Sequence, residues 1–302
     1  MKRHHWMFWT LQAVLLVVVA VFMWRAVVDN LDQLRASTIT WEVRPMWLVL
    51  AVVVVLLTYV LLIETWRMVL RGWGQVLPFR EAARIWTLAN LGRYIPGKVW
   101  AVAGLVVLAQ RSGVAGWAAA GSAVVVQGIA LGTGAAVVVA MLPGDVHVGW
   151  IAAAVVLAVV TYVVPIWPWA VRRISGLVAQ EGLVPLRWPA VLGAVGAATI
   201  AWVGYGVAFW CLLHGLVAVP MPVTLAIGAF AAGYIIGFLA AFAPGGIGVR
   251  EGVIGPLIVG SVGAGPALVA VAAQRILFTL TEGLAALVGF ALGGLGRTDG
   301  LD

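Results

Sequence analysis

Residues 90–100, NLGRYIPGKVW, place two cations and the pair Pro96-Gly97 inside a chain that is otherwise rich in Val, Ala, Leu and Gly. A Pro-Gly pair ends one helix and allows another to begin, because proline removes a backbone donor and glycine adopts conformations that other residues avoid. A second stretch, APGGIGVREG at residues 243–252, repeats the pattern. The sequence therefore predicts two broken helices.

The composition around these stretches is that of an integral membrane protein. Of the 302 residues, 64% are hydrophobic and 10% are charged. A membrane helix needs about 20 mostly apolar residues, and this chain has room for many. The net charge of +7 favours loops that face anionic lipid. We expect no nucleic-acid partner, because no soluble basic face is present to hold one.

Eight apolar segments organise the chain into one predicted domain, 1–302. Two of them, 82–110 and 221–262, contain the Pro-Gly breaks. Backbone groups freed at membrane depth must face protein or a wet cavity, so each is interpreted as a re-entrant hairpin of two half-helices. A pair of kinked full helices is the alternative. The other six segments are long enough to span the membrane: 6–28, 45–67, 114–142, 149–170, 188–216 and 266–294.

The distribution of charge predicts an orientation and an internal repeat. With the N-terminus in the cytoplasm, ten basic residues flank the inner ends of the full spans and three flank the outer ends. The two hairpins then enter from opposite sides. The unit span–hairpin–span occurs twice, at 45–142 and 188–294, which indicates an inverted-topology repeat of the kind found in many transporters. The expected fold is an all-α polytopic membrane protein.

Burying a polar side chain in the bilayer costs free energy, so the presence of each polar residue in these apolar segments requires an explanation. They cluster at the two breaks and along the last span, where Arg275, Thr279 and Glu282 share one helix face. The candidate substrate-binding residues are Arg93, Tyr94, Pro96, Gly97, Lys98, Gln127, Pro244, Gly245, Gly246, Arg250, Glu251, Gln274, Arg275 and Glu282.

The chemistry of the breaks favours an anion. A helix that begins after a break points free N–H groups and its positive dipole end into the membrane interior. Arg93 and Lys98 add cations at the first break and Arg250 at the second, and arginine matches phosphate oxygens. Two structural alternatives stay open. Arg250–Glu251 and Arg275–Glu282 could be ion pairs, and Arg93 and Lys98 could extend to the lipid interface.

Motifs of enzymes and metal proteins are missing from the sequence. It contains no nucleophile elbow, metal-ligand pairing or Walker loop, and its one cysteine, Cys211, excludes an intrachain disulfide. We expect neither a cofactor nor a metal. Without an ATP site, transport would be downhill or coupled to protons or potential, with Glu251 and Glu282 as the groups that titrate.

Several stretches resemble a known family, the lysylphosphatidylglycerol synthetase transmembrane (flippase) domain. They are NLGRYIPGKVW with VLAQRSGV (107–114), APGGIGVREGVI (243–254) and ETWRMVLRGWG (64–74). The resemblance covers almost the whole chain and implies a polytopic lipid translocase for phospholipids or polyprenyl-phosphate-linked sugars. Some members carry an aminoacyl-transfer domain; we expect none here. Many relatives have Glu-Arg near Gln127-Gly128, and its absence puts the role of that pair in doubt.

We therefore expect a flippase for an anionic, phosphate-bearing lipid, in a prokaryotic cell membrane with both termini in the cytoplasm. Three other classes remain. The first is a membrane-embedded enzyme or enzyme subunit, the second is a scaffold for a lipid-dependent glycosyltransferase, and the third is a transporter of small solutes with a closed cavity. A lipid-modifying enzyme or glycosyltransferase is the expected protein partner.

Overall fold

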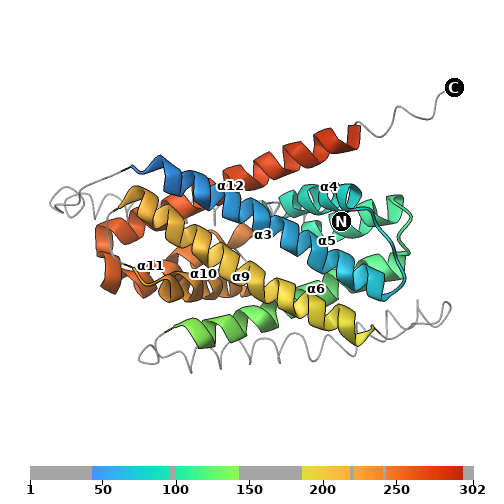
Figure 1. The fold of residues 1–302 in the computed structure, drawn as a ribbon, viewed down its shortest axis with the longest axis horizontal. Helices are drawn as coiled ribbons and strands as arrows, with labels where there is room; N and C mark the ends of the chain where they lie inside the picture. Colours follow the sequence, from blue (N-terminus) through green and yellow to red (C-terminus); the bar gives the residue numbers. More distant parts are fainter. Residues whose placement is uncertain (1–42, 95–98, 143–185, 218–220, 241–242, 295–302) are drawn as a thin grey trace, which may run out of the picture.

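The computed structural model describes residues 43–94, 99–142, 186–217, 221–240 and 243–294, and every element in these ranges is a helix. The long helices α3, α6 and α9 run roughly along one axis of the bundle (Figure 1). The predicted all-α class is confirmed. In chain order the helices are α3 (Pro45–Gly72), α4 (Phe79–Asn90), η1 (Leu91–Tyr94), α5 (Val99–Arg111), α6 (Gly116–Met141), α9 (Trp188–Leu216), α10 (Val223–Leu239), η3 (Pro244–Gly246), α11 (Val249–Val262) and α12 (Ala264–Gly294).

Four of these helices, α3, α6, α9 and α12, are long and apolar enough to cross a membrane. The 28 residues of α3 extend for about 40 Å, more than the roughly 30 Å of a bilayer's hydrocarbon core. Prolines lie in the first turns of α3 and α9, where no backbone donor is needed. These helices coincide with four predicted spans, and the predicted spans 6–28 and 149–170 lie outside the described residues.

The two segments with Pro-Gly breaks form pairs of short helices. In the first, α4 has 12 residues and α5 has 13, and the two pack against each other. In the second, α10 has 17 residues and packs against α11, which has 14. Helices of 12 or 13 residues reach only about 20 Å, too short to span a bilayer. These are helix–break–helix hairpins rather than kinked full helices, and their depth in a membrane stays a prediction.

Glycines on α10 allow its close contact with α11. A Cβ at Gly233 would lie 2.5 Å from Cγ1 of Ile254, so only glycine fits there. Gly237, one turn further along, lies against the stem of Arg250. The corresponding small pair on α6, Gly128 and Gly132, has no described atom within 4 Å of a built Cβ. One small-xxx-small pair therefore makes a helix contact, whereas the other meets no atom of the described residues.

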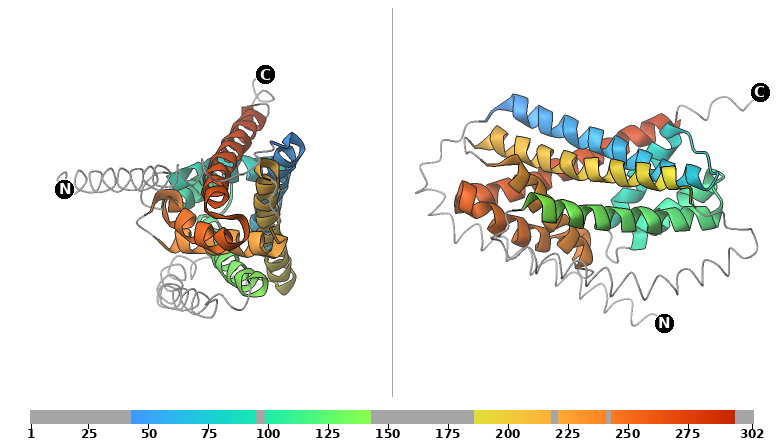
Figure 2. Two further views of the ribbon diagram at one scale, coloured as in Figure 1. Left: turned by 90° about the vertical axis from the view of Figure 1, so that its left-hand side faces the viewer. Right: turned by 60° about the horizontal axis from the view of Figure 1, so that its bottom comes forward.

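Helices of the two halves of the chain pack against each other in a reciprocal pattern. The backbone N–H of Arg44 donates to Gly215 O at 2.9 Å, while Gly72 lies beside Ala190, so α3 and α9 are antiparallel. Figure 2 shows α9 between α3 and α6. The long helix α6 packs on α10, and the long helix α12 packs on α4. In an inverted repeat, a contact made by one helix is matched by a contact of its counterpart in the other half, as these two contacts are. The repeat itself stays a prediction.

Candidate anion-binding cavity

The two helix breaks meet inside the bundle, where η1 contacts η3. Three hollows surround this contact, and Arg93 and Tyr234 line all of them. We name them the central cavity, the side hollow and the amide hollow. The amide hollow is lined, besides the two shared residues, by Leu62, Trp86, Asn90, Val126, Gln127, Ala130, Ala198, Ala201, Trp202 and Tyr205. The central cavity is lined by Tyr59, Arg93, Tyr94, Tyr205, Phe230, Tyr234, Gly245, Arg250, Gln274, Arg275, Phe278, Thr279 and Glu282. Asn90, Ala101, Val102, Gln127, Gly237, Phe238, Gly245, Gly246 and Arg250 join the two shared residues around the side hollow.

Glu282 on α12 connects the first break to the last helix. Its Oε1 lies 3.1 Å from Nη1 of Arg93, and its Oε2 accepts a hydrogen bond of 2.6 Å from the hydroxyl of Tyr94. Arg93 also donates through Nη2 to Oδ1 of Asn90 at 2.7 Å. The Arg275–Glu282 pair that the sequence left open is therefore wrong, because the carboxylate belongs to Arg93.

Arg275 instead holds the second break. Its Nη1 donates to the carbonyl oxygen of Gly245 at 2.9 Å. Gly245 has φ +57°, in the left-handed region that favours glycine, and a Cβ there would lie 2.8 Å from Nη2 of Arg275. Glycine is thus preferred at this position for its backbone conformation, and a Cβ here would displace the end of the Arg275 side chain.

Arg250 enters the central cavity from the first turn of α11. Its guanidinium carbon lies 4.6 Å from the ring centroid of Tyr234 and 5.5 Å from that of Phe230, distances typical of cation–π contacts. No carboxylate of the described residues lies within ion-pair distance of it. Glu251 caps α11 by accepting a hydrogen bond of 2.6 Å from Gly248 N. The alternative of an Arg250–Glu251 pair is wrong, and Glu251 lines none of the three hollows.

Buried polar atoms without a hydrogen-bond partner gather at these hollows. In the described part of the chain there are five such side-chain atoms, and every one belongs to a lining residue. Four are donors, and the fifth, Glu282 Oε1, still faces Arg93 in the ion pair. The donors are Asn90 Nδ2, Arg250 Nε, Gln274 Nε2 and Arg275 Nη2.

Each unmet donor costs about 1–3 kcal/mol, so the cluster needs a physical explanation. Three guanidinium groups but one carboxylate line the central cavity. Excess positive charge and unmet donors together suit a ligand with several acceptor oxygens and a negative charge, such as a phosphate or carboxylate.

Most of the candidate residues from the sequence come together here. Besides those described above, Gln127 lines the side and amide hollows, and Gly246 lines the side hollow. Pro244 lies in η3, and only its backbone is described. Pro96, Gly97 and Lys98 lie outside the described residues, so their predicted role at the first half-helix stays a prediction.

Apart from Tyr94, the aromatic residues of the central cavity were missed by the sequence reasoning. Tyr205 stacks on Phe230 with ring centroids 5.2 Å apart, and Phe278 packs against both. Asn90 was also missed. A signal for the tyrosines was present in the composition, because the chain has five and four of them line this cavity.

These features define a polytopic α-helical membrane protein in which two helix breaks enclose a cationic cavity. The chain belongs to the family described as the lysylphosphatidylglycerol synthase TM region, whose model matches residues 12–289 of the 302. The resemblance of the sequence motifs is thereby confirmed. No curated protein matches the chain. Membership assigns it to membrane proteins with a lipid-related function.

Proposed function

We propose that the protein is a flippase that moves an anionic lipid, either a phosphate-bearing phospholipid or a polyprenyl-phosphate-linked sugar, between the leaflets. The carrying observation is the set of three buried donors without partners, Arg250 Nε, Gln274 Nε2 and Arg275 Nη2, around a cavity with three arginines. A phosphate group offers acceptor oxygens and negative charge to these donors, and the two breaks allow exposure to alternate sides. We propose transport without chemical change to the lipid and without a cofactor.

The side hollow supports a lipid rather than a small solute as cargo. It is lined by Val102 of α5, a residue that is 43% exposed on the outside of the bundle, and by Phe238 of α10. It also shares Arg93 and Arg250 with the central cavity. A headgroup held by the arginines would leave its acyl or prenyl tail toward this opening, in contact with membrane lipid.

We propose a prokaryotic cell membrane as the location, with both termini in the cytoplasm. Arg71, Arg80, Arg111 and Arg187 lie at the end of the bundle where α3 finishes and α9 begins, which the positive-inside rule assigns to the cytoplasm. The test uses single cysteines in a Cys211→Ser background. An impermeant thiol reagent on intact cells should label Val43→Cys and leave Val76→Cys unlabelled; the reverse pattern would overturn the orientation. Both positions are exposed.

The transport proposal is tested with purified protein in vesicles that contain a fluorescent phosphatidylglycerol or a fluorescent polyprenyl-phosphate sugar. Loss of fluorescence on adding an impermeant quencher reports translocation. Arg250→Ala and Arg275→Ala should slow it about 10- to 100-fold, the equivalent of 1.5–3 kcal/mol for a hydrogen bond to a charged group. Arg111→Ala is the matched control, because Arg111 is exposed and lines none of the hollows.

The outcome also separates the competing classes. A scaffold for a glycosyltransferase would tolerate Arg250→Ala and Arg275→Ala, and an enzyme would change the headgroup, which mass spectrometry of the recovered lipid detects. Normal translocation by both variants would contradict the proposal. A glycosyltransferase or other lipid-modifying enzyme as partner is compatible with it, because such an enzyme would supply or consume the lipid.

A further inference from the structure

The amide hollow is not needed to hold a phosphate. Its lining comes mainly from α4, α6 and α9, and it shares Arg93, Tyr205 and Tyr234 with the central cavity, so the two hollows adjoin. Its side-chain amides are those of Asn90 and Gln127, which also line the side hollow. The indole rings of Trp86 and Trp202 form part of its wall.

The side-chain amides of Asn90 and Gln127 have hydrogen-bonding groups that no described residue uses. Nδ2 of Asn90 is buried without a partner, while its Oδ1 accepts from Arg93 at 2.7 Å. Gln127 forms no hydrogen bond with any described residue and is half-buried. A side-chain amide both donates and accepts, which matches the hydroxyl groups of a polyol.

The aromatic wall is rigid and has no free indole donor at Trp202. The Trp202 Nε1–H donates to Ala130 O at 3.0 Å and to the Thr133 hydroxyl at 3.2 Å. What Trp202 can offer a ligand is therefore the surface of its ring. The negative face of an aromatic ring attracts positively polarised C–H groups, such as those on one face of a sugar ring.

The charge of the amide hollow argues against a cationic headgroup. No carboxylate is among its lining residues, and the charge that it does hold is that of Arg93. Glu282, the partner of Arg93, lines the central cavity and not this hollow. Aromatic rings can also bind ammonium groups, but the charged group that an ammonium would meet in this hollow is the Arg93 guanidinium, and no carboxylate lines the hollow to bind the ammonium.

We propose that the amide hollow is a subsite for a neutral polyhydroxylated group that is joined through a phosphodiester to the lipid. Arg250, Gln274 and Arg275 would hold the phosphate, and Asn90, Gln127 and the indole rings would hold the polyol. The inference rests on the proposed function and narrows its cargo to phosphodiester-linked glycosyl or polyol lipids, as opposed to aminoacylated ones.

The test is isothermal titration of the purified protein in detergent. The paired probes are farnesyl methyl phosphate and farnesyl glucosyl phosphate, which carry the same charge. The protein should bind the glucosyl diester about tenfold more tightly, the equivalent of 1.4 kcal/mol from one or two extra hydrogen bonds. Gln127→Ala should remove most of this preference, because it should weaken binding of the glucosyl diester much more than binding of the methyl diester. Gln110→Ala is the control, because Gln110 is exposed and lines none of the hollows.

Further probes identify which class of lipid carries the polyol, and they define the results that would contradict the proposal. Preference for phosphatidylinositol over the glucosyl diester would assign the polyol to a glycerolipid, and the reverse preference would assign it to a prenyl lipid. Equal binding of the two farnesyl diesters, or tightest binding of lysyl-phosphatidylglycerol, would overturn the subsite and leave the flippase standing. Failure of every phosphate lipid to bind would overturn the proposed function as well.

Discussion

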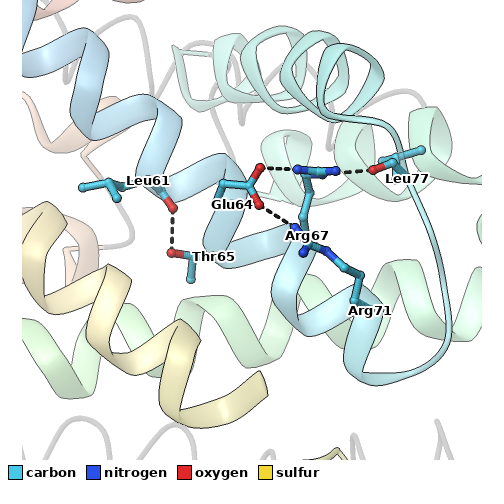
Figure 3. Close-up of polar contacts among 6 residues, drawn as sticks. All are labelled: Leu61, Glu64, Thr65, Arg67, Arg71 and Leu77. Atoms are coloured by element: carbon cyan, nitrogen blue, oxygen red, sulfur yellow. Dashed lines mark hydrogen bonds and ion pairs between the residues drawn. The ribbon is translucent and has the colours of Figure 1, made fainter. Parts of the chain in front are cut away.

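Two groups of arginines in the described part of the chain differ in how completely their charges are matched. At the end of α3, the Glu64 carboxylate pairs with both Arg67 and Arg71, and Arg67 Nε donates to Leu77 O at 2.9 Å (Figure 3). In the central cavity, the one carboxylate pairs with Arg93, and the other two arginines retain buried donors without partners.

The comparison separates arginines whose side-chain donors are paired within the protein from arginines whose buried donors have no partner. Arg67 also lies over the ring of Phe79, at 5.6 Å from its centroid, so this peripheral group fixes the connection between α3 and α4. The charge and the Nε donor of Arg67 are both paired within the protein. The unmet donor of Arg250 has no such structural use, since an apolar residue of similar volume would avoid its cost. Arg275 holds the second break through Nη1 and still retains an unmet donor at Nη2. Unmet donors, rather than the presence of arginine, are therefore the basis of the proposed binding site.

The largest expected effect is on Glu282, the one carboxylate that joins the central arginines to the fold. Glu282→Ala would leave Arg93 without its counterion and the Tyr94 hydroxyl without its strongest acceptor. Breaking such a buried pair from one side should lower the free energy of unfolding by about 3–5 kcal/mol, measured by thermal unfolding in detergent. Glu282→Gln retains an acceptor for Tyr94 and should lose less. If Glu282→Ala had the same melting temperature as the unmodified protein, this role would be contradicted.

Arg250 should show the opposite balance between stability and activity. Arg250→Met keeps most of the side-chain volume and removes a buried donor that has no partner. Unfolding free energy should therefore stay within about 1 kcal/mol of the unmodified protein or rise, while lipid translocation falls at least about tenfold. Thermal unfolding and the vesicle assay measure the two quantities on one preparation. A strong loss of stability with normal translocation would make Arg250 a structural residue like Arg67.

Gly245 tests whether the geometry of the second break matters beyond its backbone strain. Gly245→Ala puts a residue with a Cβ into a left-handed backbone conformation, which should lower the free energy of unfolding by about 1–2 kcal/mol. The added Cβ also displaces Arg275. Gly74→Ala is the matched control, since Gly74 has φ +74° and no atom within 4 Å of a built Cβ. Both variants should melt slightly earlier, and Gly245→Ala alone should slow translocation. Equal translocation by the two variants would show that Arg275 tolerates the displacement.

The smallest effect belongs to Arg71 in the peripheral group. Its side chain is 47% exposed, and exposed ion pairs contribute about 1 kcal/mol or less because water and salt screen them. Arg71→Ala should therefore lower the melting temperature slightly at low salt, with a smaller difference at high salt, and should leave translocation unchanged. A translocation defect as large as that of Arg275→Ala would remove the distinction between the two groups.

The sequence by itself determined the class of the protein, four of the long helices and the positions of the two hairpins. The predicted segment 188–216 and the observed α9 have the same bounds. These features are local: apolar length predicts a membrane helix, and a Pro-Gly pair predicts a break, whatever else the chain contacts. Polar residues in apolar segments are equally visible, so all three lining arginines were found.

Only the tertiary structure decided which groups pair. Helical spacing brought Glu282 and Arg275 to one face of a single helix, yet Glu282 pairs with Arg93 from the other half of the chain, and Glu251 caps α11. Four tyrosines from separate elements meet in the central cavity, a convergence that no local pattern contains. Spacing along one helix specifies a shared face, but the partner of that face depends on which helices pack together, and this is set by the burial of the whole chain.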